Sequence, residues 1–108
     1  MNINKYIHTL IKQLREPTEG TDREAVRARL AYARAYRQGE DALKRYRDKA
    51  IAAEIGKVHD KDAQIAILAN EHIYPEEYEA YQAFRAECKA KVDADIATLR
   101  AELEAALA

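Results

Sequence analysis

Apolar residues recur along the chain with the period of an α-helix, and the stretch from Pro75 to Ala108 shows this period over the greatest length. At about 100° per residue, its apolar side chains share an arc of roughly 140°. These residues are Tyr78, Tyr81, Phe84, Cys88, Val92, Ile96, Leu99, Leu103, Ala106 and Leu107. Pro75 suits the first helical position, and the glutamates at 76 and 77 suit the positive end of the helix dipole. The pattern predicts one amphipathic helix over 75–107.

A shorter amphipathic helix is predicted at the amino terminus, over residues 3–15. Its large apolar residues follow the i, i+3, i+4, i+7 spacing and also share an arc of about 140°. The stretch from Pro17 to Gly20 then ends the helix in a turn. We expect this helix to dock by its single apolar face.

A second long helix is predicted over residues 22–57. Thr21 and Glu24 have the spacing of a capping box, in which the threonine hydroxyl accepts a hydrogen bond from the backbone N–H three residues on. Gly39 can either break this helix or be tolerated inside it at a cost of about 1 kcal/mol. Charge pairs at i, i+4 directly after Gly39 favour continuity.

The stretch that follows has the weakest pattern. Asp60 or Asp62 can cap a short helix over 62–72, whereas Ile65 and Ile67 alternate as they would in a strand. Helix is the favoured interpretation.

Taken together, the elements predict a single all-α domain over residues 1–108. A helix over 75–107 would be roughly 50 Å long, whereas a compact domain of this size has a radius of gyration of about 13 Å. Such a helix must lie along another long element, either of the same chain or of a second copy. We expect an elongated helical hairpin or small bundle with a coiled-coil-like terminal helix.

Composition makes the expected core thin. The chain has 22 alanines but only 21 Leu, Ile, Val and Phe residues, just under one fifth of its length. A net charge of -1 argues against disorder, which usually accompanies a large net charge. A thin core and an overlong apolar stripe predict self-association, with a dimer favoured.

Charge is distributed unevenly along the chain. Residues 1–50 hold 12 basic and 7 acidic side chains, whereas residues 51–108 hold 6 and 12. The basic half interleaves arginines with tyrosines, a combination that can neutralise phosphates and stack on unpaired bases. A candidate nucleic-acid-binding stripe shares one sector of the second helix: Arg23, Arg27, Arg34 and Arg37. The favoured alternative is a solvated face, or arginines that pair with the acidic half.

Two further arginines, Arg29 and Arg85, fall among apolar positions. Burying an unpaired charge is costly, so each should lie at the edge of its stripe, stack on a tyrosine or pair with a carboxylate. Asp95 and Glu77 are the candidate carboxylates. We interpret both arginines as marking a helix interface, whose other predicted members belong to the terminal stripe: Val92, Ile96, Leu99, Leu103 and Leu107.

The sequence has no signature of an enzyme, a cofactor or a metal site. Its three histidines lack ligand spacing, and it has neither a glycine-rich phosphate loop nor a serine nucleophile. The single cysteine, Cys88, is expected to be a buried structural thiol in an intracellular protein. No apolar run reaches the length of a membrane span, so a cytoplasmic location fits best.

The favoured function is therefore that of a small structural or protein-interaction protein without catalytic activity. The alternative is a nucleic-acid-binding accessory protein that uses the arginine stripe. In general style the chain is similar to small helical accessory proteins of bacteria and their prophages, although no motif assigns it to a family.

Overall fold

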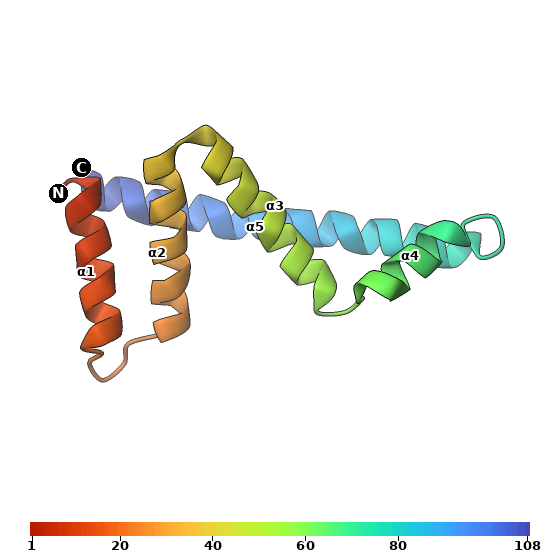
Figure 1. The fold of residues 1–108 in the computed structure, drawn as a ribbon, viewed down its shortest axis with the longest axis horizontal. Helices are drawn as coiled ribbons and strands as arrows, with labels where there is room; N and C mark the ends of the chain where they lie inside the picture. The colour runs from red at the N-terminus through yellow and green to blue at the C-terminus, as the bar shows by residue number, and fades with distance from the viewer. The chain divides into compact units, whose positions relative to one another are not determined.

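Five α-helices and no strand make up the protein in a computed structural model that describes all residues 1–108 (Figure 1). In chain order they are α1 (Ile3–Arg15), α2 (Arg23–Gln38), α3 (Glu40–Gly56), α4 (Lys61–Ala69) and α5 (Pro75–Leu107). The predicted all-α class and the long C-terminal helix are confirmed. None of the five helices combines the length and the apolar character that crossing a membrane requires.

The starts of three helices are capped by side chains. Asn2, Asp22 and Asp60 accept hydrogen bonds from backbone N–H groups in the first turns of α1, α2 and α4. The predicted capping box at Thr21 is wrong, because its hydroxyl instead accepts from the backbone N–H of Thr18 in the preceding turn. The aspartate one residue later is the better cap, since its negative charge also complements the helix dipole.

Gly39 divides the predicted second helix into α2 and α3. Its φ of 113° lies in the left-handed region that side chains disfavour. Its N–H donates to the Ala35 carbonyl at the end of α2, and its own carbonyl accepts from the N–H of Leu43 in α3. The expected continuity over 22–57 is therefore wrong. The i, i+4 charge pairs after Gly39 stabilise α3 by itself and place no constraint on α2.

The chain forms two compact units, where its length predicted one domain. Unit 1 comprises residues 1–46 and 95–108, and unit 2 comprises residues 47–94. Helices α1 and α2 belong to unit 1 and α4 to unit 2, while α3 and α5 contribute to both. Unit 1 has 11 basic and 9 acidic side chains, and unit 2 has 7 and 10. Unit 1 is thus weakly basic and unit 2 acidic.

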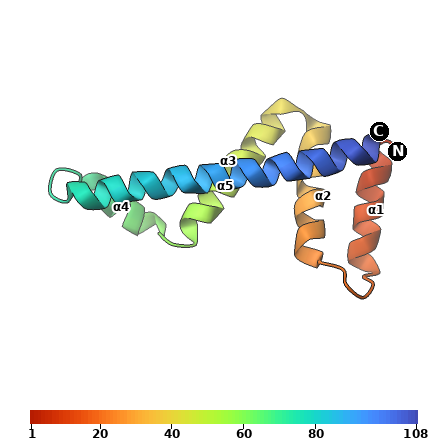
Figure 2. The ribbon, with the colours of Figure 1, turned by 180° about the vertical axis from the view of Figure 1, so that it is seen from behind.

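In unit 1, α1 and α2 lie side by side, and the C-terminal end of α5 lies across them (Figure 1, Figure 2). The N-terminal ammonium group of Met1 donates to the Ala106 carbonyl at 3.2 Å, so the two chain ends meet here. Tyr32 and Leu103 are the largest fully buried side chains. The buried cluster consists of Tyr6, Ile7, Leu10, Val26, Leu30, Tyr32, Ala33 and Leu103.

Unit 2 is built from α4 and from the parts of α3 and α5 that belong to it. It buries six apolar side chains: Ile51, Ile55, Ile67, Tyr81, Cys88 and Val92. Burial of Cys88 agrees with the structural thiol expected from its place on the stripe. Five other large apolar residues of this unit remain exposed: Val58, Ile65, Leu68, Ile73 and Tyr74.

Candidate functional surfaces

The terminal apolar stripe of α5 packs inside the chain. Leu103 is fully buried in the unit 1 cluster, and Ile96, Leu99 and Leu107 are partly buried against that cluster. Val92 is buried in unit 2, with 3% of its surface exposed. The five stripe residues predicted at the interface are therefore covered by other parts of their own chain. Their binding to a second protein stays a prediction, and the surface for a partner has to be sought on other residues.

Arg29 joins α2 to α5 inside unit 1. Its Nε donates to a carboxylate oxygen of Glu102, and both side chains are about one third exposed. Its partner is neither Asp95 nor Glu77, the two candidate carboxylates, but Glu102, which precedes the fully buried Leu103 in α5. Burial, with the Glu102 charge as a second cause, raises the pKa of neighbouring Tyr6. The pair thus marks a contact between two helices of one chain.

Arg85 has a different environment in unit 2. Its guanidinium carbon lies 5.9 Å from the centre of the Tyr81 ring, a cation–π arrangement. Its Nε is buried and has no hydrogen-bond partner. Neither of the two candidate carboxylates, Asp95 and Glu77, pairs with it. Of the three environments predicted for a buried arginine, namely a stripe edge, a tyrosine face or a carboxylate partner, Arg29 has the carboxylate and Arg85 has the tyrosine face.

The predicted nucleic-acid stripe lies on α2, and all four of its arginines are exposed. Two of them hold α1. Arg23 donates to a carbonyl at the end of α1 at 3.3 Å, and Arg37 donates to the Asn4 side chain at 3.1 Å. Arg27 and Arg34 have neither an ion pair nor a side-chain hydrogen bond. Only these two remain available to contact a phosphate backbone.

The tyrosines near this stripe are mostly engaged in the core. Tyr32 is 1% exposed, and its hydroxyl accepts from Arg100 Nε at 3.2 Å. It contacts Tyr46 edge-on at 5.7 Å between ring centres, and burial raises the Tyr46 pKa. Tyr36, 37% exposed, is the more accessible of the tyrosines on α2. Stacking of bases on Tyr32 would require the core of unit 1 to open.

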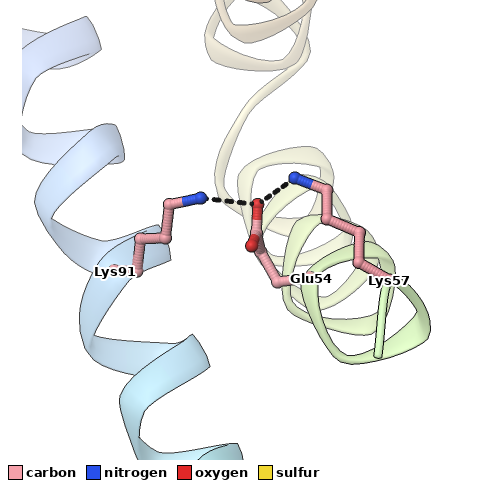
Figure 3. Close-up of polar contacts among 3 residues, drawn as sticks. All are labelled: Glu54, Lys57 and Lys91. Carbon is pink, nitrogen blue, oxygen red and sulfur yellow. Dashed lines mark hydrogen bonds and ion pairs between the residues drawn. The ribbon is translucent and has the colours of Figure 1, made fainter. Parts of the chain in front are cut away.

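Ion pairs join α3 to α5 in unit 2. One oxygen of Glu54 accepts from Lys57 at 2.7 Å and from Lys91 at 3.0 Å (Figure 3). These two hydrogen bonds hold the pKa of Glu54 below its ordinary value. Arg47 contacts both oxygens of Asp93, at 2.7 and 3.2 Å, and the hydrogen bond lowers the Asp93 pKa. The Arg47 charge is therefore largely compensated.

A small aromatic and amide network holds the start of α4 against α5. The His59 ring meets the rings of Tyr81 and Phe84 edge-on, each at 5.3 Å between centres. Gln64 donates to the His59 carbonyl at 3.0 Å and accepts from the Tyr81 hydroxyl at 2.8 Å. These contacts assign His59 a packing role.

A groove of about 560 Å³ lies in unit 2 beside the start of α4. Apolar residues of α3, among them Ile51 and Ile55, line part of it. Its charged lining consists of Arg47, Asp48, Asp60, Lys61, Arg85 and Lys89. Four of the seven basic side chains of unit 2 thus border the groove, but only two of its ten acidic ones do. We call it the basic groove, a positive site on an acidic unit.

The exposed apolar residues of unit 2 concentrate on α4 and on the turn that follows it. Ile65 and Leu68 on α4 are 64% and 44% exposed, and Ile73 and Tyr74 in the turn are 67% and 58% exposed. The sequence predicts no function for this stretch, because its apolar pattern is weak. Strong exposure of neighbouring large apolar side chains is typical of a binding surface.

No group of three or more His, Cys, Asp or Glu side chains is arranged to hold a metal ion. Comparison of the chain with known protein families, with curated proteins and with solved structures gives no match. Function must therefore be inferred from the surfaces of the molecule itself.

Proposed function

We propose that this protein is a small helical structural protein that acts by self-association through unit 2. One observation carries the proposal. Of the seven large hydrophobic residues that the chain exposes, five lie within residues 58–74. Apolar side chains that are exposed together usually mark a protein interaction site, because covering them removes apolar surface from water.

A second copy of the chain is a reasonable partner on electrostatic grounds. The net charge of -1 means that two copies repel each other only weakly. The units also carry opposite net charges, so each copy offers both signs to another.

Light scattering tests this proposal directly. Over micromolar concentrations the protein should have about twice the 12.3 kDa mass of one chain. Replacing Ile73 and Tyr74 by serine should return the mass to that of one chain, because both side chains are more than half exposed. Tyr36→Ser, on α2 of unit 1, is the matched control and should leave the mass unchanged. A wild-type protein with the mass of one chain throughout would overturn the proposal.

Nucleic-acid binding is a second candidate, and the exposed, unpaired Arg27 and Arg34 are the observation that favours it. If it is correct, mobility-shift titrations should show binding that weakens with salt. Replacing both arginines by glutamine should weaken binding and reduce the salt slope by about 0.9 per lost phosphate contact on duplex DNA. Lys44→Gln with Arg45→Gln, both exposed on α3, is the matched control. Unchanged binding in the α2 variant would remove this candidate.

A further inference from the structure

The two ends of α4 differ in charge. At its N-terminal end lies the basic groove, which Asp60 and Lys61 border. At its C-terminal end lie the turn after α4 and the first residues of α5. We call residues 71–77 the acidic tip, because they include Glu71, Glu76 and Glu77 beside His72, Ile73, Tyr74 and Pro75. All seven tip residues are exposed. One short helix thus connects two surfaces of opposite charge.

Positive charge in the basic groove is only partly compensated. Lys61 and Lys89 are exposed and have no ion pair, and Arg85 has no carboxylate partner. Of the two acidic residues in the lining, Asp60 already uses its carboxylate to cap α4 through the Ala63 N–H at 2.7 Å. The groove therefore offers cations, beside apolar side chains of α3, to an acidic and apolar ligand.

The acidic tip has the complementary composition. None of its three glutamates, Glu71, Glu76 and Glu77, has an ion-pair partner. Between them stand Ile73 and Tyr74, which are 67% and 58% exposed. An apolar pair flanked by carboxylates matches a groove that combines apolar side chains with unpaired cations.

A tip cannot occupy the groove of its own chain. The nine residues of α4 separate the two surfaces. At 1.5 Å per residue this helix is about 13 Å long, and its rigidity keeps its ends apart. The complementary groove must therefore belong to a second copy.

We propose that two copies pair their α4 helices antiparallel about a two-fold axis, each inserting its acidic tip into the basic groove of the other. This inference depends on the proposed self-association and names its surfaces. Ile65, the central residue of α4, would lie near the axis with Leu68 beside it, so that the exposed face of α4 is covered. Such an arrangement is self-complementary, as a two-fold interface requires, and opposes the two helix dipoles favourably.

Charge reversal tests the pairing. The tip variant carries Glu76→Lys and Glu77→Lys, and the groove variant carries Lys61→Glu and Lys89→Glu. A homodimer of either variant would bring like charges together at both of its tip–groove contacts. We therefore expect each variant to dimerise at least about tenfold more weakly than the wild type. In a mixture of the two variants every tip meets a groove of opposite charge, so the dimer should return as a heterodimer. One chain with all four substitutions should also dimerise.

The matched control is the pair Lys5→Glu and Glu19→Lys in unit 1, both exposed, which should dimerise like the wild type. Circular dichroism checks that the helices of each variant still form. The four-fold variant also serves as a control for the two lysines at the start of α5, because it carries the same Glu76→Lys and Glu77→Lys changes as the tip variant. If the wild type is a dimer but the tip and groove variants dimerise equally well, this pairing is overturned while self-association stands. The same conclusion follows if dimerisation does not recover in the mixture and in the four-fold variant. A monomeric wild type overturns both.

Discussion

Units 1 and 2 are built from the same kind of helix, yet they treat their apolar side chains differently. Unit 1 gathers them into one cluster in which Tyr32, Ala33 and Leu103 are at most 1% exposed. Unit 2 buries Ile67 of α4 but leaves Leu68, the next residue, 44% exposed. Two helices with a third lying across them can enclose a cluster, whereas α4 is short and apolar on more than one side.

The difference lies in how much of its apolar surface each unit covers with side chains of its own chain. A short helix that packs by one face covers only the side chains of that face, and its other apolar side chains stay in water. Under the proposed self-association, unit 1 contributes stability and unit 2 contributes binding. Substitutions at buried and exposed positions of the two units test that division.

The largest effect should come from Leu103→Ala in the core of unit 1. Truncating a fully buried leucine removes apolar contacts and leaves a cavity, which costs about 2–5 kcal/mol. Leu68→Ala in unit 2 is the matched change at an exposed position and should cost about 1 kcal/mol or less. Denaturant unfolding at one low protein concentration measures both, so that self-association does not add to the difference. Equal losses in the two variants would show that burial of Leu103 adds no more stability than the exposed Leu68 does.

Glycine positions provide the next contrast. Gly39→Ala in unit 1 places a side chain at a φ of 113°, so we expect a loss of about 1–2 kcal/mol although the space around it is open. Gly56→Ala at the end of α3 in unit 2 meets neither strain nor a neighbour and should gain about 0.5–1 kcal/mol. Thermal unfolding followed by circular dichroism compares the two. A stabilised Gly39 variant would show that the break between α2 and α3 is not required.

A smaller effect is expected from Tyr32→Phe. This change removes the hydroxyl that accepts from Arg100, with little change in packing, and should cost about 0.5–1.5 kcal/mol. Tyr36→Phe, on the same helix and more exposed, should change stability by less than about 0.5 kcal/mol. Denaturant unfolding distinguishes the two variants. Equal costs would mean that the Arg100 contact adds nothing to the core of unit 1.

The smallest effect concerns the exposed ion pairs of unit 2, which solvent screens. Lysine hydrogen bonds lower the pKa of Glu54 in the folded state. Its contribution is therefore complete above the ordinary glutamate pKa of 4.5 and is lost as the pH falls through the lower folded value. Wild-type stability should fall more steeply than that of Glu54→Gln over this acidic range. Parallel pH profiles of unfolding would show that the pair in Figure 3 does not contribute.

The positions of the helices follow from local patterns, and the sequence predicts them well. Regular apolar spacing places α1 and α5 at the observed residues 3–15 and 75–107. Asp60 is one of the two caps considered for the helix after residue 57. Gly39 is the exception, because a glycine inside a helix costs only about 1 kcal/mol relative to alanine, and packing decides whether the helix continues through it.

The candidate surfaces are much less visible in the sequence. An apolar stripe shows which side chains of α5 avoid water, but not what covers them. In the structure Val92 and Leu103 are covered within the chain, each in a different unit. Ile73 and Tyr74 lie in a turn without periodicity, so the sequence pattern does not predict their exposure. The basic groove brings together Lys61, Arg85 and Lys89, which come from distant parts of the sequence.

The all-α class, the bounds of α1 and α5 and the long amphipathic face follow from the sequence, since they depend on interactions among residues three to four apart. The tertiary structure is needed to see that this face is used inside the chain and that the exposed apolar surface lies on α4 and the turn after it. Burial depends on which helices meet, and the apolar period of a helix is the same whatever packs against it.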